Sequence, residues 1–207
     1  MKTVVTIGRQ FGSGGHEIGR LIASHYNIKC YDKELIARVS EESGLTKDLI
    51  ARQDEKPVGS FLYNLVMDTY SFGYKTSGYV DMPMSHKVFL AQFETIKRIA
   101  QEGPCVIVGR CAEYALSEME NVLRVFVVAD EPFKIANLRK RDPEIDSDEK
   151  AVEMMKQIDK QRKTYHNFYT SARWGEAAHY DLSVNTGVLG IEGTAGLIVR
   201  VIDEMEG

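Results

Sequence analysis

A cluster of glycine residues follows the first apolar run of the sequence. Val4 to Gly8 is β-branched and predicts a short buried strand, and the segment RQFGSGGH, residues 9–16, comes directly after it. Closely spaced glycines let successive backbone N–H groups turn toward one point, and the N-terminus of a following helix adds positive potential there. This segment therefore favours binding of an anion, and phosphate is the expected one.

Two known phosphate-binding loops can be compared with this segment, and neither matches it completely. The dinucleotide fingerprint GxGxxG requires a third glycine where the chain has Glu17, although Asp32 ends the second predicted strand, where a ribose-binding acid belongs. In the mononucleotide loop GxxxxGKS/T, Arg9 and Gly14 take the two glycine positions and Gly15 takes that of the lysine. A tight strand-to-helix turn without a ligand is the alternative that the loop alone leaves open.

A long charged segment, residues 147–169, predicts a helix with Ser147 as its N-cap. At about 100° per residue, one face of this helix combines apolar and charged side chains: Met155, Ile158, Asp159, Arg162, Tyr165, His166 and Tyr169. An arginine within an apolar stripe is costly unless it is paired or binds an anion, and Asp159 is close enough along the helix to orient Arg162. An ordinary surface ion pair between these two residues is the alternative.

Further arginines lie where predicted strands and helices end. Arg110 directly follows the apolar run CVIVG, Arg139 and Arg141 end the helix after VLRVFVVA, and Arg173 precedes the only tryptophan. The planar guanidinium group donates two parallel hydrogen bonds to phosphate oxygens, although Arg139 and Arg141 could equally cap their helix electrostatically. A net acidic chain with arginines at these places is expected to bind a small anion, which points toward phosphoryl transfer.

The elements that must position these residues alternate along the chain. Apolar runs predict strands over residues 4–8, 28–31, 105–109, 122–129 and 182–185, and helical periodicity lies between them. This alternation predicts an α/β fold with a parallel sheet covered on both faces. Residues 44–86 depart from the pattern because Gly, Ser, Tyr and Phe accumulate there, which indicates an inserted, aromatic-rich subdomain.

Composition narrows the function classes. The 207 residues carry 26 Lys and Arg against 30 Asp and Glu, so the net charge is −4, and no basic excess suggests a nucleic-acid surface. No apolar stretch approaches the ~20 residues of a membrane span, and the N-terminus does not resemble a signal peptide. Three cysteines cannot pair completely, which favours reduced thiols. We therefore expect a cytoplasmic protein that binds neither nucleic acid nor a membrane.

Five segments together resemble the cytidylate kinase-like family of P-loop kinases. They are VTIGRQFGSGGHEIGRLI, YDKELI, CVIVGRCAEYAL, DKQRKTYHNFYTSARWG and YDLSVNTGVLGIE, and they extend over nearly the whole chain. The resemblance implies a three-layer αβα P-loop kinase with a central parallel sheet, in a single domain over residues 1–207. It also implies a helical insertion that binds the nucleoside monophosphate at about 44–86 and a short arginine-bearing lid at about 139–151.

The resemblance also implies roles for individual residues. Gly12, Ser13, Gly14 and Gly15 would hold the phosphates of ATP, and Asn185 with Thr186 would lie by its base. Asp32, Arg110 and Arg173 would bind the acceptor nucleotide. Arg139 and Arg141 would close on the donor, and Asp159 and Arg162 would grip the acceptor and the transferring group. Catalysis of this type consists mostly of positioning and charge neutralisation.

The sequence departs from the family pattern in the phosphate loop. Gly15 replaces the usual lysine, and His16 or Glu17 stands where a serine or threonine would contact the metal. No aspartate ends the third strand before Gly109, so the ligands of the expected Mg²⁺ stay undefined. We hypothesise that Arg9 supplies the missing positive charge, because it precedes the glycines and could fold over them.

The leading hypothesis is an ATP-dependent nucleoside monophosphate kinase with CMP or dCMP as acceptor, acting as a monomer or homodimer. A nucleotide-binding regulatory module without catalysis is the first alternative, since the lysine and hydroxyl are missing. A kinase of another small metabolite is the second, because fold analogy cannot decide the acceptor.

Overall fold

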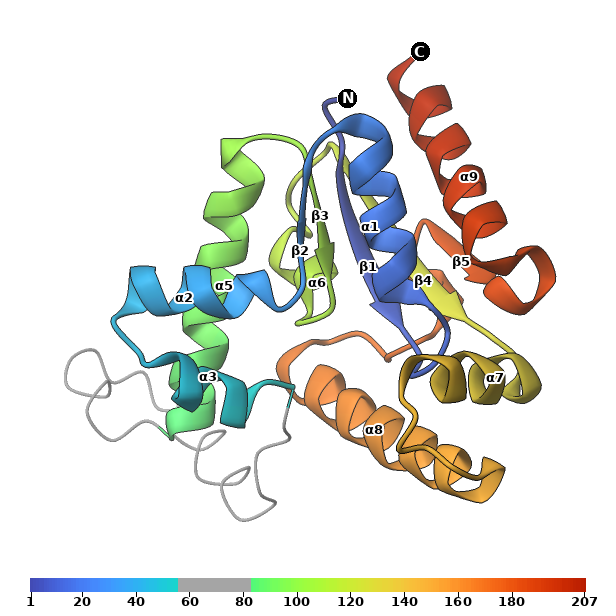
Figure 1. Cartoon of the computed structure of the whole chain (residues 1–207). Helices are drawn as coiled ribbons and strands as arrows, with labels where there is room; N and C mark the ends of the chain where they lie inside the picture. Colours follow the sequence, from blue (N-terminus) through green and yellow to red (C-terminus); the bar gives the residue numbers. More distant parts are fainter. Residues whose placement is uncertain (56–82) are drawn as a thin grey trace.

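The computed structural model describes residues 1–55 and 83–207, and the aromatic-rich part of the predicted insertion, residues 56–82, lies outside them. Five parallel strands form one sheet in the order β2-β3-β1-β4-β5 (Figure 1). Their bounds are β1 Val4–Arg9, β2 Lys29–Tyr31, β3 Cys105–Val108, β4 Val122–Val128 and β5 Leu182–Asn185. The predicted α/β fold with a parallel sheet is confirmed, and the strand ends agree with the sequence prediction to one residue.

Helices cover both faces of the sheet. On one face, α1 (Gly15–Tyr26) and α9 (Thr186–Glu206) share a core with side chains of the central strands, among them Val5 and Ile7. On the other face, α2 (Glu34–Ser43), α3 (Lys47–Gln53), α5 (Met84–Glu102) and the short α6 (Ala112–Ala115) pack on Val4 and Ile107. Strands buried on both sides are continuous apolar runs, as the sequence shows, and the result is a three-layer αβα arrangement.

Two helices occupy the carboxyl edge of the sheet. After β4, Asp130 caps α7 (Glu131–Arg141) by accepting the Phe133 N–H, and Ser147 caps α8 (Asp148–Tyr169) by accepting the Lys150 N–H. Both caps satisfy backbone donors that a helix N-terminus leaves open. The C-terminal half of α8 lies below the ends of β1 and β3 (Figure 1), and side chains of α8 contact the backbone of Arg9 and Phe11 at the start of the glycine loop.

The strand order reverses between β1 and β3, which are parallel neighbours in the sheet. The loop after β1 leads to α1 on one face, whereas the turn after β3 leads to α6 on the other face. In open parallel sheets, ligands bind in the crevice that such a reversal opens at the carboxyl ends of the strands. No helix in the described part of the chain is both long and apolar enough to cross a membrane.

Candidate functional site

The glycine loop has the backbone conformation that an anion-binding loop requires. Gly12 and Gly14 adopt φ values of 83° and 84°, a left-handed region that residues with a Cβ rarely enter. The Gly12 carbonyl oxygen accepts a hydrogen bond of 2.9 Å from the Asn137 side chain of α7. Ser13 is buried, and both its hydroxyl, at 2.8 Å, and its backbone N–H, at 3.3 Å, donate to the Gln10 carbonyl oxygen.

Gly15 is the first residue of α1, and the stem of Arg9 limits the space there. A Cβ at Gly15 would lie 2.7 Å from the Arg9 Cβ and 3.0 Å from its Cγ. Contacts below 3 Å between carbon atoms do not occur without displacement, so a larger residue at position 15 requires the stem of Arg9 to shift. The residues at the two positions where the mononucleotide loop has glycine and lysine, Arg9 and Gly15, are therefore in close contact with each other.

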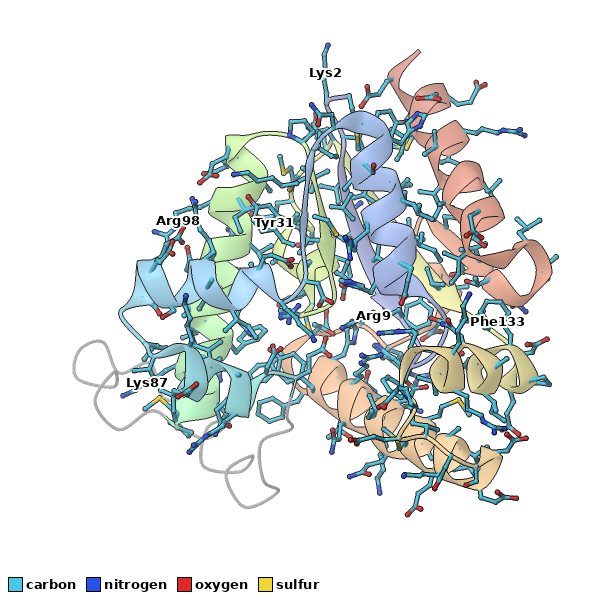
Figure 2. The ribbon with its side chains drawn as sticks, viewed as in Figure 1. Lys2, Arg9, Tyr31, Lys87, Arg98 and Phe133 are labelled. Atoms are coloured by element: carbon cyan, nitrogen blue, oxygen red, sulfur yellow. The ribbon has the colours of Figure 1, made fainter. Side chains whose placement is uncertain are left out.

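Arg9 lies at the carboxyl edge of the sheet (Figure 2), and its side chain reaches Gly109, directly after β3. A Cβ at Gly109, whose φ is 79°, would lie on top of the Arg9 Nη1 atom. The Arg9 guanidinium thus lies against the glycine that directly follows β3, where the strand order of the sheet reverses. The charge of Arg9 therefore lies beside the glycine loop. It is directed toward Arg110, which the family resemblance assigns to acceptor binding.

Glu55 joins three arginines that come from different elements. Its Oε1 atom accepts Arg9 Nη1 at 2.7 Å and the Arg110 backbone N–H at 3.2 Å, and its Oε2 atom accepts Arg162 Nε at 3.2 Å. Burial alone would raise the pKa of Glu55, but the Arg9 and Arg162 guanidiniums outweigh it and hold that pKa far below its usual range. Glu55 is therefore a carboxylate at every physiological pH.

Arg110 is buried, and carboxylates satisfy its donors. Its Nε and Nη2 atoms donate to the two carboxylate oxygens of Asp54 at 3.0 and 2.8 Å, and Nη1 donates to Asp32 at 3.1 Å. Burial opposes the charged guanidinium, but Asp54 and Glu55 outweigh it and raise the pKa of Arg110. Gly109, Arg110 and Cys111 all have positive φ, a run of left-handed residues that only strong local contacts sustain.

Asp32 connects the two halves of the site. Besides its contact with Arg110, its Oδ2 atom lies 2.7 Å from His16 Nδ1 in the first turn of α1. Burial would raise the pKa of Asp32, but the Arg110 and Arg9 charges prevail and hold the pKa below its usual range. The ionised Asp32 therefore ties the helix after the glycine loop to the arginine at the end of β3.

Asp159 and Arg162 lie on one face of α8, which contacts the glycine loop, but neither is the closest partner of the other. Asp159 Oδ1 accepts the Phe11 backbone N–H at 2.7 Å, while its distance to Arg162 Nη1 is 3.9 Å. Arg162 donates to the Arg9 carbonyl oxygen at 3.2 Å as well as to Glu55, and it lies 5.7 Å from the centre of the Phe11 ring. Burial raises the pKa of Asp159, against the opposing Phe11 N–H and Arg162 charge.

The two arginines of the predicted lid point to different places. Arg141 Nε lies 3.0 Å from Glu17 on α1, which keeps Arg141 at the mouth of the cleft. Arg139 instead pairs at 2.8 Å with Asp148 at the start of α8, away from the glycine loop. Only Arg141 is therefore brought to the other site residues in this arrangement.

A cleft of about 700 Å³ collects most of the predicted residues. Its lining comes from the end of β1 with the glycine loop and the start of α1, from the segments after β2, α3 and β3, and from α2, α3, α7 and α8. The lining residues are Arg9, Gln10, Phe11, Gly12, Gly14, Gly15, His16, Asp32, Lys33, Glu34, Ile36, Ala51, Asp54, Glu55, Arg110, Arg141 and Arg162. Asp159 lies beside it through Phe11. Arg173 does not line it, since its side chain is 83% exposed and lies 4.0 Å from Glu176. Asn185 ends β5 and caps α9 through the Gly187 N–H.

Sequence reasoning missed Asp54 and Glu55, the two acids that organise the arginines. Both follow α3 within the range assigned to the insertion, where no strand end marked them as site residues. Adjacent acids also occur elsewhere in the sequence, for example Glu41-Glu42 and Asp148-Glu149, so the pair itself gave no signal.

A family model described as the cytidylate kinase-like family matches residues 4–188. The chain belongs to the cytidylate kinase-like family. No sequence among the curated proteins matches the chain. Thus the predicted family is confirmed, and family and fold together support a phosphotransferase.

Solved structures of similar fold agree with this assignment. An uncharacterized protein from Eubacterium ventriosum is 29% identical with a TM-score of 0.72, and the match covers 98% of this chain and 99% of that one. A shikimate kinase from Bacteroides thetaiotaomicron is 13% identical with a TM-score of 0.56, over 98% and 99% of the two chains. A shikimate kinase from Acinetobacter baumannii in complex with shikimate is 10% identical with a TM-score of 0.50, over 99% and 94%. The shikimate kinases show the P-loop kinase fold.

Proposed function

We propose that the protein transfers the γ-phosphoryl group of ATP to a nucleoside monophosphate, with CMP and dCMP as the first acceptors to test. One observation carries this proposal: Arg9 of β1 and Arg162 of α8 meet on one carboxylate, beside the glycine loop, where the strand order reverses between β1 and β3. Two guanidiniums beside a backbone anion site suit phosphoryl transfer, because such catalysis stabilises charge on the transferring oxygens.

On the donor side, the backbone N–H groups from Gly12 to Gly15 would hold the ATP phosphates at the N-terminus of α1. Arg9 would supply the charge that lysine provides in other P-loops, because its stem lies over Gly15. Arg141 would approach from the lid, and the segment after Asn185 would lie by the base. Arg9 lies among ion pairs rather than on the loop surface, so its charge would act where donor and acceptor meet.

On the acceptor side, Asp32 and Arg110 would position the monophosphate at the ends of β2 and β3. The carboxylates already saturate Arg110, so Arg110 would act by holding Asp32 and Asp54 in place as much as by direct contact. Asp159 and Arg162 would orient the transferring group from α8. Arg173 and Arg139 stay predictions of the family pattern that the described cleft does not include.

Magnesium has no set of free acidic ligands among the described residues. Asp32, Asp54 and Glu55 all lie within 3.2 Å of arginine nitrogen atoms, and no cluster of three metal-binding side chains occurs there. The described residues therefore do not fit a protein-held Mg²⁺ site. In many ATP-dependent enzymes this ion is bound largely by substrate phosphates and water.

We further propose that residues 44–86 form the acceptor-binding insertion and residues 139–151 the lid of one kinase domain. The described parts that support this are Asp54 and Glu55, which follow α3, and Arg141 at the end of α7, whose side chain pairs with Glu17.

A coupled assay of ADP release over a panel of acceptors tests the function. The panel contains CMP, dCMP, UMP, AMP, GMP and shikimate, each with ATP and Mg²⁺, and product mass confirms the transfer. We expect ADP release that depends on a pyrimidine monophosphate and on enzyme concentration. Turnover with shikimate alone would instead assign a small-metabolite kinase, and no acceptor-dependent release would refute the kinase.

A nucleotide-binding regulatory module is the second candidate, and Gly15 in the place of the P-loop lysine favours it. Arg9, Arg110, Arg141 and Arg162 each have a carboxylate partner within 3.2 Å, so none is free to bind phosphate without rearrangement. Calorimetric binding of ATP with no acceptor-dependent release over the whole panel would establish this module.

A further inference from the structure

Glu55 is held as an oxyanion would be held. Its two carboxylate oxygens receive donors from β1, from the turn after β3 and from α8, at 2.7 to 3.2 Å. One of these donors is a backbone N–H and two are guanidinium groups. This mixture is typical of phosphate sites, where fixed backbone donors and planar guanidiniums share the oxygens of one group.

Arg9 and Arg162 depend on Glu55 more than the other arginines of the cleft do. Arg110 has Asp54 and Asp32 as its own partners, and Arg141 has Glu17. Arg162 also approaches Asp159, but at 3.9 Å, and burial together with the Arg9 charge lowers the pKa of Arg162. Two nearly buried guanidiniums therefore share one carboxylate, and any anion that replaced Glu55 would find the same donors.

The backbone of Glu55 indicates that this contact has an energetic cost. Its φ is 50°, in the left-handed region that is uncommon for residues other than glycine, asparagine and aspartate. Such a conformation persists only where surrounding contacts compensate for it, and here the compensating contacts are the ion pairs themselves. Withdrawal of the side chain would relieve the backbone, while an incoming phosphate would replace the lost charge.

We propose that the Glu55 carboxylate occupies an oxyanion subsite formed by Arg9, Arg162 and the Arg110 N–H, and that a phosphoryl group displaces it. The inference rests on the proposed function for the identity of the phosphoryl group, and the subsite itself rests on the contacts of Glu55. Glu55 then competes with ligand in the free protein. The apparent affinity for phosphate is lowered by the fraction of molecules in which Glu55 holds the subsite.

Calorimetric titration of inorganic phosphate into the full chain tests the proposal. Glu55→Gln keeps the shape of the side chain and removes its charge, so we expect it to bind phosphate at least about tenfold more tightly than the unchanged protein. Glu42→Gln is the matched control, because Glu42 also pairs with two arginines, Arg38 and Arg98, but lies outside the cleft. We expect Glu42→Gln to leave phosphate affinity unchanged.

Two further variants make the result decisive. Arg162→Ala added to Glu55→Gln must abolish the gain, which separates this subsite from the glycine loop. Should Glu55→Gln fail to fold, Glu55→Asp retains the charge on a side chain one methylene shorter, and it must also bind phosphate more tightly. Phosphate affinity that is equal to or weaker than that of the unchanged protein, in whichever of the two variants folds, overturns the proposal.

The outcome is separate from the test of the kinase. Tighter phosphate binding without transfer to any acceptor would uphold the subsite and reject the proposed function. Transfer to a monophosphate with no gain in phosphate affinity would do the reverse, and Glu55 would then be a permanent counter-ion of Arg9 and Arg162.

Discussion

At the carboxyl edge of the sheet, the site on one side of β1 consists of backbone groups and the site on the other side consists of charged side chains. Toward α1, the site consists of main chain: Gly12 and Gly14 adopt left-handed conformations, and Ser13 is buried. Toward β3, it consists of charged side chains, in which Arg9, Arg110 and Arg162 share carboxylates from residues 54 and 55. A backbone site needs no counter-ion when empty, whereas an arginine site that is mostly buried needs one. The comparison explains why Asp54 and Glu55 lie on the β3 side, where the buried arginines are.

Removal of Arg162 is expected to have the largest effect on the side-chain half. Arg162→Ala should lower the rate of phosphoryl transfer by about 100-fold or more, because the loss of one well-placed donor to a developing charge costs that much. Initial rates at saturating ATP and acceptor measure it. Arg98→Ala is the control, since Arg98 is half exposed and pairs with Glu42 on α2. Equal losses in the two variants would contradict the role given to Arg162.

Glu55→Gln is expected to lower stability in a pH-dependent way. The folded pKa of Glu55 lies below its unfolded value, so its charge stabilises the fold above the unfolded pKa of about 4.5, and this contribution falls as pH decreases below it. At pH 7 the variant should lose about 2–3 kcal/mol of unfolding free energy, since two nearly buried guanidiniums lose their partner. Urea unfolding at pH 7, 5 and 4 checks this. A difference that stays constant down to pH 4 would be inconsistent with an ionised Glu55.

Gly15→Ala probes the place where the two halves meet. Its Cβ would lie 2.7 Å from that of Arg9, so we expect a loss of about 1–3 kcal/mol from overpacking. Gly196→Ala on α9 is the matched control, because no atom lies within 4 Å of its Cβ and alanine favours a helix. That variant should gain about 0.5–1 kcal/mol. Thermal unfolding followed by circular dichroism measures both, and a neutral Gly15→Ala would remove the steric coupling to Arg9.

Substitutions of the two lid arginines are expected to have the smallest effects, and these effects are on ATP affinity. Arg141→Ala should weaken ATP binding by about tenfold, because Arg141 lies at the cleft beside Glu17 and one charge-assisted contact is worth roughly 1.4 kcal/mol or more. Arg139→Ala should change it less than about threefold, as expected for an exposed pair with Asp148. A larger effect from Arg139 would mean that the lid rearranges when ATP binds.

The same comparison separates what sequence reasoning could predict from what it could not. The strands of the sheet are buried runs, and the Ser147 cap and the glycine loop are local patterns, so their positions followed from neighbouring residues. The spacing along α8 also placed Arg162 and Asp159 on one face of the helix. These features depend on interactions within a few residues of the chain.

The partners of the arginines could not be predicted in this way. Glu55 lies 46 positions from Arg9 and 107 from Arg162, and no periodicity relates them. The direction of the Arg9 side chain depends on Gly109 of a neighbouring strand as well as on Gly15. Helical spacing suggested Asp159 as the partner of Arg162, but tertiary packing gave the Asp159 carboxylate to the Phe11 N–H instead.

Calorimetric titration of ATP into the unchanged protein and into Arg9→Met tests the central claim most directly. Methionine keeps an unbranched stem over Gly15 and removes the charge. The account predicts saturable binding of one ATP per chain, weakened at least about tenfold in Arg9→Met, as expected for the loss of a charge-assisted contact. Equal affinities, or no binding heat with the unchanged protein, would contradict it.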